Sequence, residues 1–329
     1  MLKFTVERLL YSVLILFFVM FLIYALIYSM PNGYVETKAR ELASRPGTGK
    51  SAAEWLADLN AQYGMDKGVV MGYFTWLKSA VTGNFGDSWA WTVPVLTQFQ
   101  NTIWYSFALG LISFILQILI AIPLGISAAR KQYSLTDYSS TVISMVCISM
   151  PTFFLATILK LIFAVKLGWL DITGMQSRDY HTLSEFGKFL DVAKHFIMPA
   201  ITLTVVSIGS LMRYTRTNML EVLNSDYIRT ARAKGVPEKK VINHHAFRNT
   251  LIPLVTTLGG SLPGLFSGAL ITETLFGIRG IGYASYNSMV QGDIPFTMFY
   301  LAFIAILTLL GNLISDILYA VVDPRVRLS

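Results

Sequence analysis

A short stretch near residue 50 carries residue types that bind nucleotide phosphates. The sequence GTGKS at 47–51 resembles the end of the Walker A loop, which holds ATP with backbone N–H groups and a lysine. That loop requires a glycine where this chain has Ser44, and no strand precedes the stretch. We therefore predict no phosphate site. Ser51 and Glu54 instead fit a capping box, which predicts a helix through about Tyr63.

Two adjacent histidines, His244 and His245, are a second candidate for chemistry, as metal ligands. Neighbouring residues on a helix point about 100° apart, so they do not share a face as an i, i+4 pair does. We predict a surface position for both and no metal site. No pairing of Ser, His and Asp and no carboxylate pair suggests catalysis, so the chain is not expected to be an enzyme. Cys147, the single cysteine, excludes an intramolecular disulfide.

Lys160 and Glu273 are ionisable residues inside long apolar runs. A charge at the centre of a membrane helix costs about 2.5–3.5 kcal/mol on insertion scales, so such a residue should face a cavity or a partner. They could line a translocation pathway or pair with each other. Alternatively, Lys160 extends its amine to the membrane interface, and Glu273 lies among the headgroups. Gln117 and Asp316 are weaker cases of the same kind.

The elements that must position these residues are membrane helices. Of the 329 residues, 54% are apolar and only 14% are charged, whereas charged residues make up about a quarter of soluble proteins. The net charge of +7 is concentrated between apolar blocks, which favours membrane orientation over nucleic-acid binding. Six apolar blocks predict an all-α integral membrane protein with six transmembrane helices. The blocks are 9–30, 100–129, 137–165, 195–214, 251–276 and 295–322.

The short loops indicate the orientation of these helices. With six crossings, the turn at Arg130, the basic loop after Tyr214 and the tail with Arg325 and Arg327 fall on one side, so both termini should be cytoplasmic. The first block is longer than the apolar region of a signal peptide, and no small-residue cleavage site follows it, so it should be a retained helix. The predicted division is a first helix in 1–30, an extracytoplasmic helical segment in 31–97, and a five-helix transmembrane core in 98–329 that includes a loop at 219–250.

Glycine and proline residues within these segments predict short helices, turns and helix breaks. In the extracytoplasmic segment we expect short helices at 72–80 and 93–98, joined through a turn with Gly83, Gly86 and Asp87. Prolines interrupt several apolar blocks, and glycines give the fifth block a small-residue face suited to close packing. Both features fit either hinges or static kinks and tight packing. The residues are Pro123, Pro151, Pro199, Pro253, Pro263, Gly259, Gly260, Gly264 and Gly268.

The basic stretch YIRTARAKGVPEKKVINHHAFRNTLIP, residues 227–253, reads as two short helices. Ser225 or Asp226 can cap the first helix, and Gly235 suits the left-handed conformation at its end. Pro237 then begins a second helix. Small side chains with basic flanks at a membrane surface indicate a docking site for another protein. The candidate docking residues are Tyr227, Ile228, Arg229, Thr230, Ala231, Arg232, Ala233, Lys234, Gly235 and His245.

Two other interpretations of this stretch remain. It could be an ordinary cytoplasmic loop that is basic because of topology alone. It could also be a DNA-binding helix-turn-helix, but apolar blocks on both sides leave no room for that fold, and we expect no nucleic-acid partner.

The stretch resembles the cytoplasmic loop of ABC-importer permeases, which docks on the ATPase subunit. In that family the loop carries the sequence Glu-Ala-Ala, followed after three residues by a glycine. Here those positions read Arg229, Thr230, Ala231 and then Gly235, so the leading glutamate is absent. That departure and the longer run to RNTLIP resemble the oligopeptide/dipeptide/nickel branch of the family. SMPTFFLA at 149–156, AVKLGWL at 164–170 and DPRVR at 323–327 extend the resemblance over nearly the whole chain.

The resemblance implies a type I ABC-importer fold in the plasma membrane and a pathway for peptides. It also implies a homologous second permease subunit, two ATPase subunits that bind ATP and Mg²⁺, and an extracytoplasmic substrate-binding protein. This chain itself would bind no cofactor. Residues 227–245 would be coupling helices seated in a groove of one ATPase.

Three alternatives differ in function. A nickel-chelate importer would use the same mechanism with another substrate. A secondary transporter or channel would need no ATPase and would leave the paired-helix loop unexplained. A membrane scaffold or sensor would recruit a partner without transport.

Overall fold

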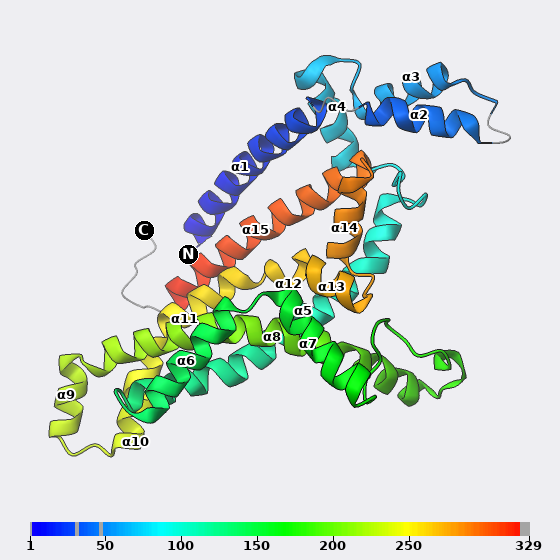
Figure 1. Ribbon diagram of the computed structural model, residues 1–329. Coiled ribbons are helices and arrows are strands. Elements are labelled where there is room, and N and C mark those ends of the chain that lie inside the picture. Colours follow the sequence, from blue (N-terminus) through cyan, green and yellow to red (C-terminus); the bar gives the residue numbers. More distant parts are fainter. Residues whose placement is uncertain (1, 30–32, 46–48, 323–329) are drawn as a thin grey trace. The chain divides into compact units, whose positions relative to one another are not determined.

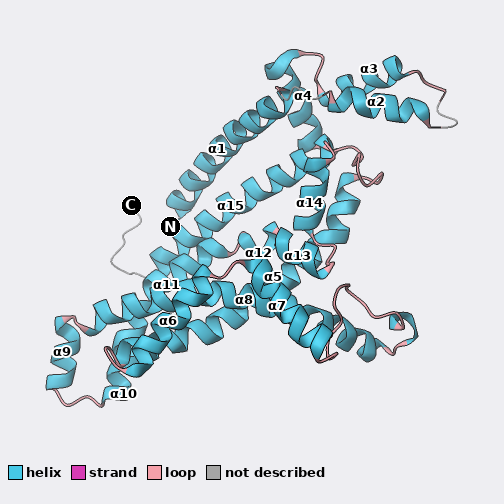
Figure 2. Ribbon diagram, in the orientation of Figure 1, coloured by secondary structure: helices cyan, strands magenta, loops and turns pink. Residues whose placement is uncertain are grey.

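The computed structural model describes residues 2–29, 33–45 and 49–322. Within these ranges the chain is helical, and an isolated bridge between Asp87 and Pro94 is its one strand-like feature (Figures 1 and 2). Residues 47 and 48 of the GTGKS stretch and the DPRVR tail with Arg325 and Arg327 lie outside the described residues.

The chain forms two compact units, which we describe separately. Unit 1 comprises Met1–Thr102 and Ala284–Leu310, and unit 2 comprises Ile103–Tyr283 and Gly311–Ser329. Two long helices contribute to both units: α5 (Val95–Arg130) and α15 (Ile294–Val322).

Unit 1 contains the long helix α1 (Leu2–Tyr28) and three shorter ones, α2 (Tyr34–Ser44), α3 (Ala52–Tyr63) and α4 (Gly68–Val81). It also holds most of α14 (Ile281–Val290) and the first turns of α15. Its core lies between α1, α4 and the start of α15 and includes Met20, Tyr24, Tyr73, Trp76 and Met298.

The capping box at the start of α3 is confirmed. The Ser51 hydroxyl accepts the N–H of Glu54, and the Glu54 carboxylate accepts the N–H of Ser51. The helix ends at Tyr63, and Gly64 follows in the left-handed conformation with φ of 71°. These bonds satisfy two backbone donors that the first turn of a helix otherwise leaves free.

Two other expectations for this region differ from the structure. The helix predicted at 72–80 begins earlier, at Gly68. The separate short helix predicted at 93–98 is wrong, because α5 begins at Val95 and continues without interruption to Arg130. The polar residues at the start of α5 do not stop the helix, since nothing between Val95 and the apolar block breaks its backbone.

Unit 2 holds the rest of α5 together with α6 (Leu135–Ser149), α7 (Thr152–Leu159) and α8 (Glu185–Leu223). A π-helical turn, η1 (Lys160–Lys166), extends α7, and a 3₁₀ turn, η2 (Tyr180–Thr182), precedes α8. The basic stretch forms α9 (Asp226–Ala233), α10 (Glu238–Lys240) and a π-helical turn, η3 (Val241–Ala246). The chain then continues through α11 (Phe247–Ser261), α12 (Gly264–Ser267) and α13 (Leu270–Phe276).

Five helical stretches within the described residues are long and apolar enough to cross a membrane, and a bent pair provides a sixth if it counts as one span. The five are Val6–Tyr28, Val95–Arg130, Glu185–Leu223, Glu238–Ser267 and Ile294–Leu318. Three contain a proline within a continuous helix, at Pro123, Pro199 and Pro253. The predicted multi-pass helical protein is therefore confirmed at the level of five to six candidate spans.

The block predicted at 137–165 is not one continuous helix. Helices α6 and α7 meet at an angle of 100°. Pro151 begins α7, and Met150 before it is extended, with ψ of 119°. A proline disfavours the helical conformation of the preceding residue, which explains the break at this point. The block predicted at 251–276 is likewise divided, at Pro263 and at Gly268, whose φ is 82°.

Candidate functional site

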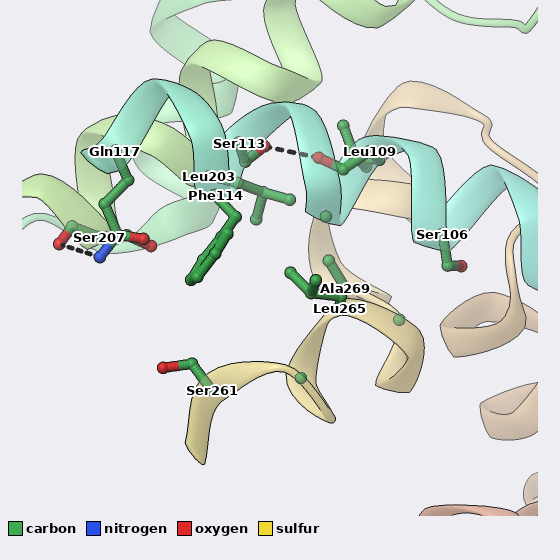
Figure 3. Close-up of a pocket in the computed structure, with 13 residues that line it drawn as sticks. Ser106, Leu109, Ser113, Phe114, Gln117, Leu203, Ser207, Ser261, Leu265 and Ala269 are labelled. Carbon is green, nitrogen blue, oxygen red and sulfur yellow. Dashed lines mark hydrogen bonds between the residues drawn. The ribbon is translucent and has the colours of Figure 1, made fainter. Parts of the chain in front are cut away.

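A cavity of about 240 Å³ in unit 2 lies beside one face of α5 (Figure 3). The α5 residues that line it include Ser106, Gly110, Ser113 and Gln117. Their spacing of four, three and four residues puts them on the same side of a helix. The cavity is completed by part of α8 and by the segment 261–269, in which the chain passes from α11 through α12.

None of the thirteen residues that line this cavity is charged. The polar groups are hydroxyls and one amide, and several are engaged between helices. Gln117 Nε2 donates to the carbonyl oxygen of Ser207 on α8 at 3.3 Å. The hydroxyl of Ser113 donates to the carbonyl oxygen of Leu109 at 2.8 Å. It also lies 3.4 Å from the carbonyl oxygen of Ala200 on α8. The hydroxyl and amide oxygens can still accept hydrogen bonds, and the uncharged wall does not select the charge of a bound molecule.

Close backbone contacts hold the segment 261–269 against its neighbours. A Cβ atom on Gly110 would lie 2.9 Å from the carbonyl oxygen of Leu265, so α5 approaches this segment at a position that only glycine permits. At Gly268 a Cβ atom would overlap the backbone of Gly282, and the positive φ also favours glycine there.

The sequence-predicted residue Glu273 lies on α13 and is fully buried. Its Oε1 atom accepts the Ser106 hydroxyl at 2.6 Å and the Ala269 N–H at 2.9 Å, and its Oε2 atom accepts the Tyr283 N–H at 2.8 Å. Ser106 in turn accepts the N–H of Ile281 at 2.8 Å. Glu273 is thus connected, through Ser106, to the cavity wall.

Lys160 occupies the first position of η1, and its amine donates to the carbonyl oxygen of Leu275 at 2.8 Å. The amine also lies 5.7 Å from the centre of the Phe276 ring, within reach of a cation–π contact. Within the described residues no ion pair joins Lys160 to Glu273, because each has other partners. Lys160 nevertheless contacts α13, the helix to which Glu273 belongs.

The basic stretch places α9 on the surface with one buried anchor. Ile228 is fully buried in a cluster with Ala129 of α5, Met219 and Leu223 of α8, and Val241 of η3. Ala231 and His245 are half-buried, and Ala231 packs against this cluster. The other predicted docking residues are exposed: Tyr227, Arg229, Thr230, Arg232, Ala233, Lys234 and Gly235.

The end of α9 is closed by a turn. Gly235 has φ of 74°, as its position predicted, and a Cβ atom there would meet no atom within 4 Å. Across the turn Arg232 forms two hydrogen bonds with Glu238, at 2.8 and 3.1 Å. This bond to the carboxylate raises the pKa of Arg232, so its positive charge is fixed. Ser225 begins the helix, but its hydroxyl donates to the carbonyl of Val222 and does not cap α9.

The two histidines lie on η3 with their ring centres 5.4 Å apart and nearly perpendicular. His244 is exposed, and the carbonyl of His245 accepts the side-chain amide of Asn249 at 2.8 Å. Within the described residues no group of three or more His, Cys, Asp or Glu side chains could hold a metal ion.

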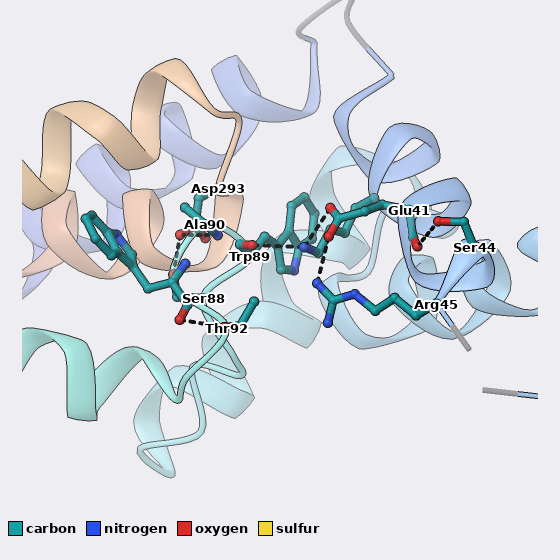
Figure 4. Close-up of polar contacts among 10 residues, drawn as sticks. Glu41, Ser44, Arg45, Ser88, Trp89, Ala90, Thr92 and Asp293 are labelled. Atoms are coloured by element: carbon teal, nitrogen blue, oxygen red, sulfur yellow. Dashed lines mark hydrogen bonds and ion pairs between the residues drawn. The ribbon is translucent and has the colours of Figure 1, made fainter. Parts of the chain in front are cut away.

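Unit 1 contains a buried carboxylate of its own, that of Asp293 (Figure 4). It accepts the hydroxyls of Ser88 and Ser288, the Ala90 N–H at 3.3 Å and the Phe296 N–H at 3.2 Å. Asp293 therefore caps the first turn of α15 and fixes the segment before α5. Nearby, Lys38 donates to the carbonyl of Trp89 and to Glu41, which also pairs with Arg45.

Of the residues of the cavity wall, the sequence singled out only Gln117, Gly264 and Gly268, the two glycines as hinge or packing residues. The available signal was weak: Ser106, Ser113 and Gln117 recur at helical spacing within an otherwise apolar block. Asp293 was also missed, because it lies in a polar turn where an acidic residue gives no signal.

Comparisons with known proteins show the family of the chain. The profile of the family described as "Binding-protein-dependent transport system inner membrane component" matches residues 121–328, and the profile of its N-terminal part matches residues 1–103. The chain is similar to the oligopeptide transport system permease protein AppB of Bacillus subtilis, with 38% identity over 81% of this chain and 83% of the relative. It is 33% identical to the dipeptide transport system permease protein DppB of Escherichia coli K12, over 93% of both. A dipeptide permease of Alkalihalophilus pseudofirmus is also 33% identical, over 99% of this chain and 100% of the relative.

Proposed function

Because this chain belongs to the family of binding-protein-dependent transport inner membrane components, we propose that it conducts peptides across the membrane. As a permease of that family it is a multi-pass membrane protein of the inner membrane and does not itself catalyse a reaction. A binding protein and an ATPase are its partners, as the family description implies.

Peptides are favoured over nickel chelates for two reasons. The relatives described above are named as oligopeptide and dipeptide permeases. The cavity wall on α5 and α8 is uncharged and carries hydroxyl and amide groups. Peptides share their backbone amides but differ in side-chain charge, so a neutral hydrogen-bonding wall suits a mixture of them.

The observation that carries the coupling proposal is the burial of Ile228. This residue fastens the exposed helix α9 to a cluster with members on α5 and α8, the two long helices that also line the cavity. A force on α9 would thus act directly on the walls of the cavity. We assign ATPase docking to the exposed residues of α9 and its end, from Tyr227 to Gly235, with Ile228 as their attachment.

The remaining members of the assembly are proposed from the family resemblance. A homologous second permease would complete the pathway, and two ATPase subunits would bind ATP and Mg²⁺. Both termini and α9 would lie in the cytoplasm, consistent with the basic loops. The polar network around Ser106 and Glu273 would hold the pathway wall in place, while Lys160 would support α13 from η1.

The test is the ATPase activity of the importer, reconstituted in liposomes with its ATPase and binding protein. Three conditions are compared: empty binding protein, binding protein loaded with mixed short peptides, and binding protein loaded with a nickel chelate. Stimulation by the peptide-loaded form supports the proposal. Stimulation by the nickel form alone would transfer the function to metal uptake. Transport by the purified chain without any ATPase would favour a channel or secondary transporter instead.

A further inference from the structure

Helix α4 belongs to the segment that the sequence assigns to the extracytoplasmic side, yet it carries apolar side chains on both its buried and its exposed face. Residues 68–77 contain no charged side chain, and Lys67 and Lys78 stand at the two ends of this run. One face is buried in the core of unit 1 through Tyr73 and Trp76. The opposite face exposes Val70, Met71, Phe74 and Val81, whose exposed fractions range from 49% to 79%.

The depth of α4 along α1 is fixed by a hydrogen bond. The Tyr73 hydroxyl donates to the carbonyl oxygen of Phe17 at 2.8 Å. Phe17 is the middle residue of the candidate span Val6–Tyr28, eleven residues before its end. At 1.5 Å per residue this is about 16 Å from the end of the span, which is half of a hydrocarbon core of about 30 Å.

Helix α15 contributes to the same core cluster. Ile294 and Met298, in the first turns of the candidate span Ile294–Leu318, are buried in the cluster that contains Tyr73 and Trp76, and Ala305 packs against it. The α15 part of this cluster thus lies in the half of the span that begins at Ile294.

The hydroxyls of Thr75 and Ser79 are satisfied inside α4, and that of Tyr73 is satisfied by α1, as lipid requires. Thr75 donates to the carbonyl of Met71 at 3.0 Å, Ser79 to that of Thr75 at 3.4 Å, and Thr82 to that of Ser79 at 2.9 Å. With 14 residues, α4 is about 21 Å long and too short to cross the bilayer. An apolar helix of this length is usually a buried core helix or a segment that enters a membrane without spanning it, and the exposed apolar face of α4 favours the second.

We propose that α4 is inserted in the leaflet at the Tyr28 end of α1 and that its exposed face contacts lipid acyl chains. The exposed residues of α4 continue the lipid-facing surface of α1, where Phe18 and Leu22 are 56% and 60% exposed and Phe74 lies 6.0 Å from the Phe17 ring. Lys67 and Lys78 flank this face and are exposed, and their long side chains can reach toward the headgroups. The proposal concerns the chain in its membrane and does not depend on the transported substrate.

The test uses spin labels on the importer reconstituted in liposomes. Single cysteines replace Met71 or Phe74, and the native Cys147 is buried, so the unsubstituted chain serves as the labelling blank. Ala57→Cys on the exposed surface of α3 is the aqueous control, and Leu22→Cys on α1 is the lipid control. We expect labels at 71 and 74 to collide more often with oxygen, which partitions into lipid, than with a water-soluble nickel complex, and the label at 57 to show the reverse ratio.

Two results would overturn the proposal. Collision ratios at 71 and 74 like that at 57 would place α4 in water. Low collision rates with both reagents would mean that another protein covers the face. Photolabelling of the unsubstituted chain with a lipid-soluble carbene provides a second measurement that needs no substitution. Labelling of α4 at the level of α1, with α2 and α3 unlabelled, supports insertion, and unlabelled α4 contradicts it.

Discussion

The hydroxyl of Ser106 donates a 2.6 Å hydrogen bond to the Glu273 carboxylate, although the two residues are 167 positions apart in the sequence. The bond joins α5 to α13 and connects a cavity-lining residue to a buried acid. Gly280 and Gly282 lie so close to this carboxylate that a Cβ atom on either would come within 3.0 Å of it. The chain after α13 is thus folded around the side chain of Glu273.

Glu273→Gln should destabilise unit 2. The carboxylate accepts three hydrogen bonds, and an amide must direct its NH₂ group at one of those donors. A buried donor without an acceptor costs about 1–3 kcal/mol, so we expect a loss of that size in the free energy of unfolding in detergent micelles. Thr274→Ala, at the exposed neighbouring position, is the control. Equal stability of the two variants would contradict the assigned role.

Ala233→Arg should abolish ATPase docking. Ala233 is exposed on α9 and touches no core cluster, so a bulky cation there should block a partner and leave the fold intact. We expect the chain to reach the membrane at normal levels, with loss of both ATPase co-purification and uptake. Ala53→Arg, an equally exposed substitution on α3, should leave both unchanged. Normal uptake by the Ala233→Arg variant would contradict the assignment of α9 as the ATPase-docking helix.

Ile228→Ala should separate ATP hydrolysis from transport. Truncating a fully buried isoleucine costs about 2–5 kcal/mol, and here the lost contacts are those that fasten α9 to α5 and α8. We expect fewer substrate molecules imported per ATP hydrolysed in proteoliposomes. Ile143→Ala on the exposed face of α6 is the matched control. An unchanged ratio would show that the cluster transmits no force.

Asp293→Ala should loosen the segment at residues 88–91. Ser88 and Ala90 both donate to the same carboxylate oxygen of Asp293, and alanine removes that acceptor. Amide hydrogen exchange in this segment should become faster by about 5- to 100-fold, as a local loss of 1–3 kcal/mol implies. Asp87→Ala, at an exposed position, should leave the exchange unchanged. If both variants exchange alike, Asp293 does not hold the segment.

The contacts of Glu41 predict an effect of acid. Partial burial tends to raise its pKa, but the hydrogen bonds and charges of Lys38 and Arg45 outweigh burial and hold the pKa below its ordinary value of 4.5. A lowered pKa stabilises the folded state above the unfolded pKa, and this stability is lost as the pH falls through the folded pKa. Hydrogen exchange in α2 should therefore accelerate below about pH 4.5. The variant Glu41→Gln should show a flatter pH profile, and an unchanged profile would refute the link.

Local rules of sequence predicted several elements well. The capping box of α3 and the glycine after α9 depend on backbone groups only a few residues apart, and both were found as expected. The length of the apolar blocks was sufficient to predict a multi-pass membrane protein. The 100° bend at Pro151 was not predicted, because a proline within an apolar block fits a kinked span as well as a broken one.

The site was harder to predict because its contacts join distant parts of the chain. Glu273 stood out as an acid in an apolar run, but nothing near it in the sequence indicated Ser106 or Tyr283 as its partners. The burial of Ile228 among exposed neighbours also required knowledge of α5 and α8. In α4 the polar residues nearby concealed how apolar the helix itself is.

The bond between Tyr73 and Phe17 also links this protein to the thickness of its membrane. Hydrophobic mismatch costs a fraction of a kcal/mol per Å, and a span relieves it by tilting. Because α4 is fastened at the middle of α1, a tilt of α1 must carry α4 and, through the short connection at Gly64, the hairpin of α2 and α3 with it. With α4 inserted as proposed above, the acyl-chain length of the surrounding lipids would set the angle of that hairpin relative to the bilayer.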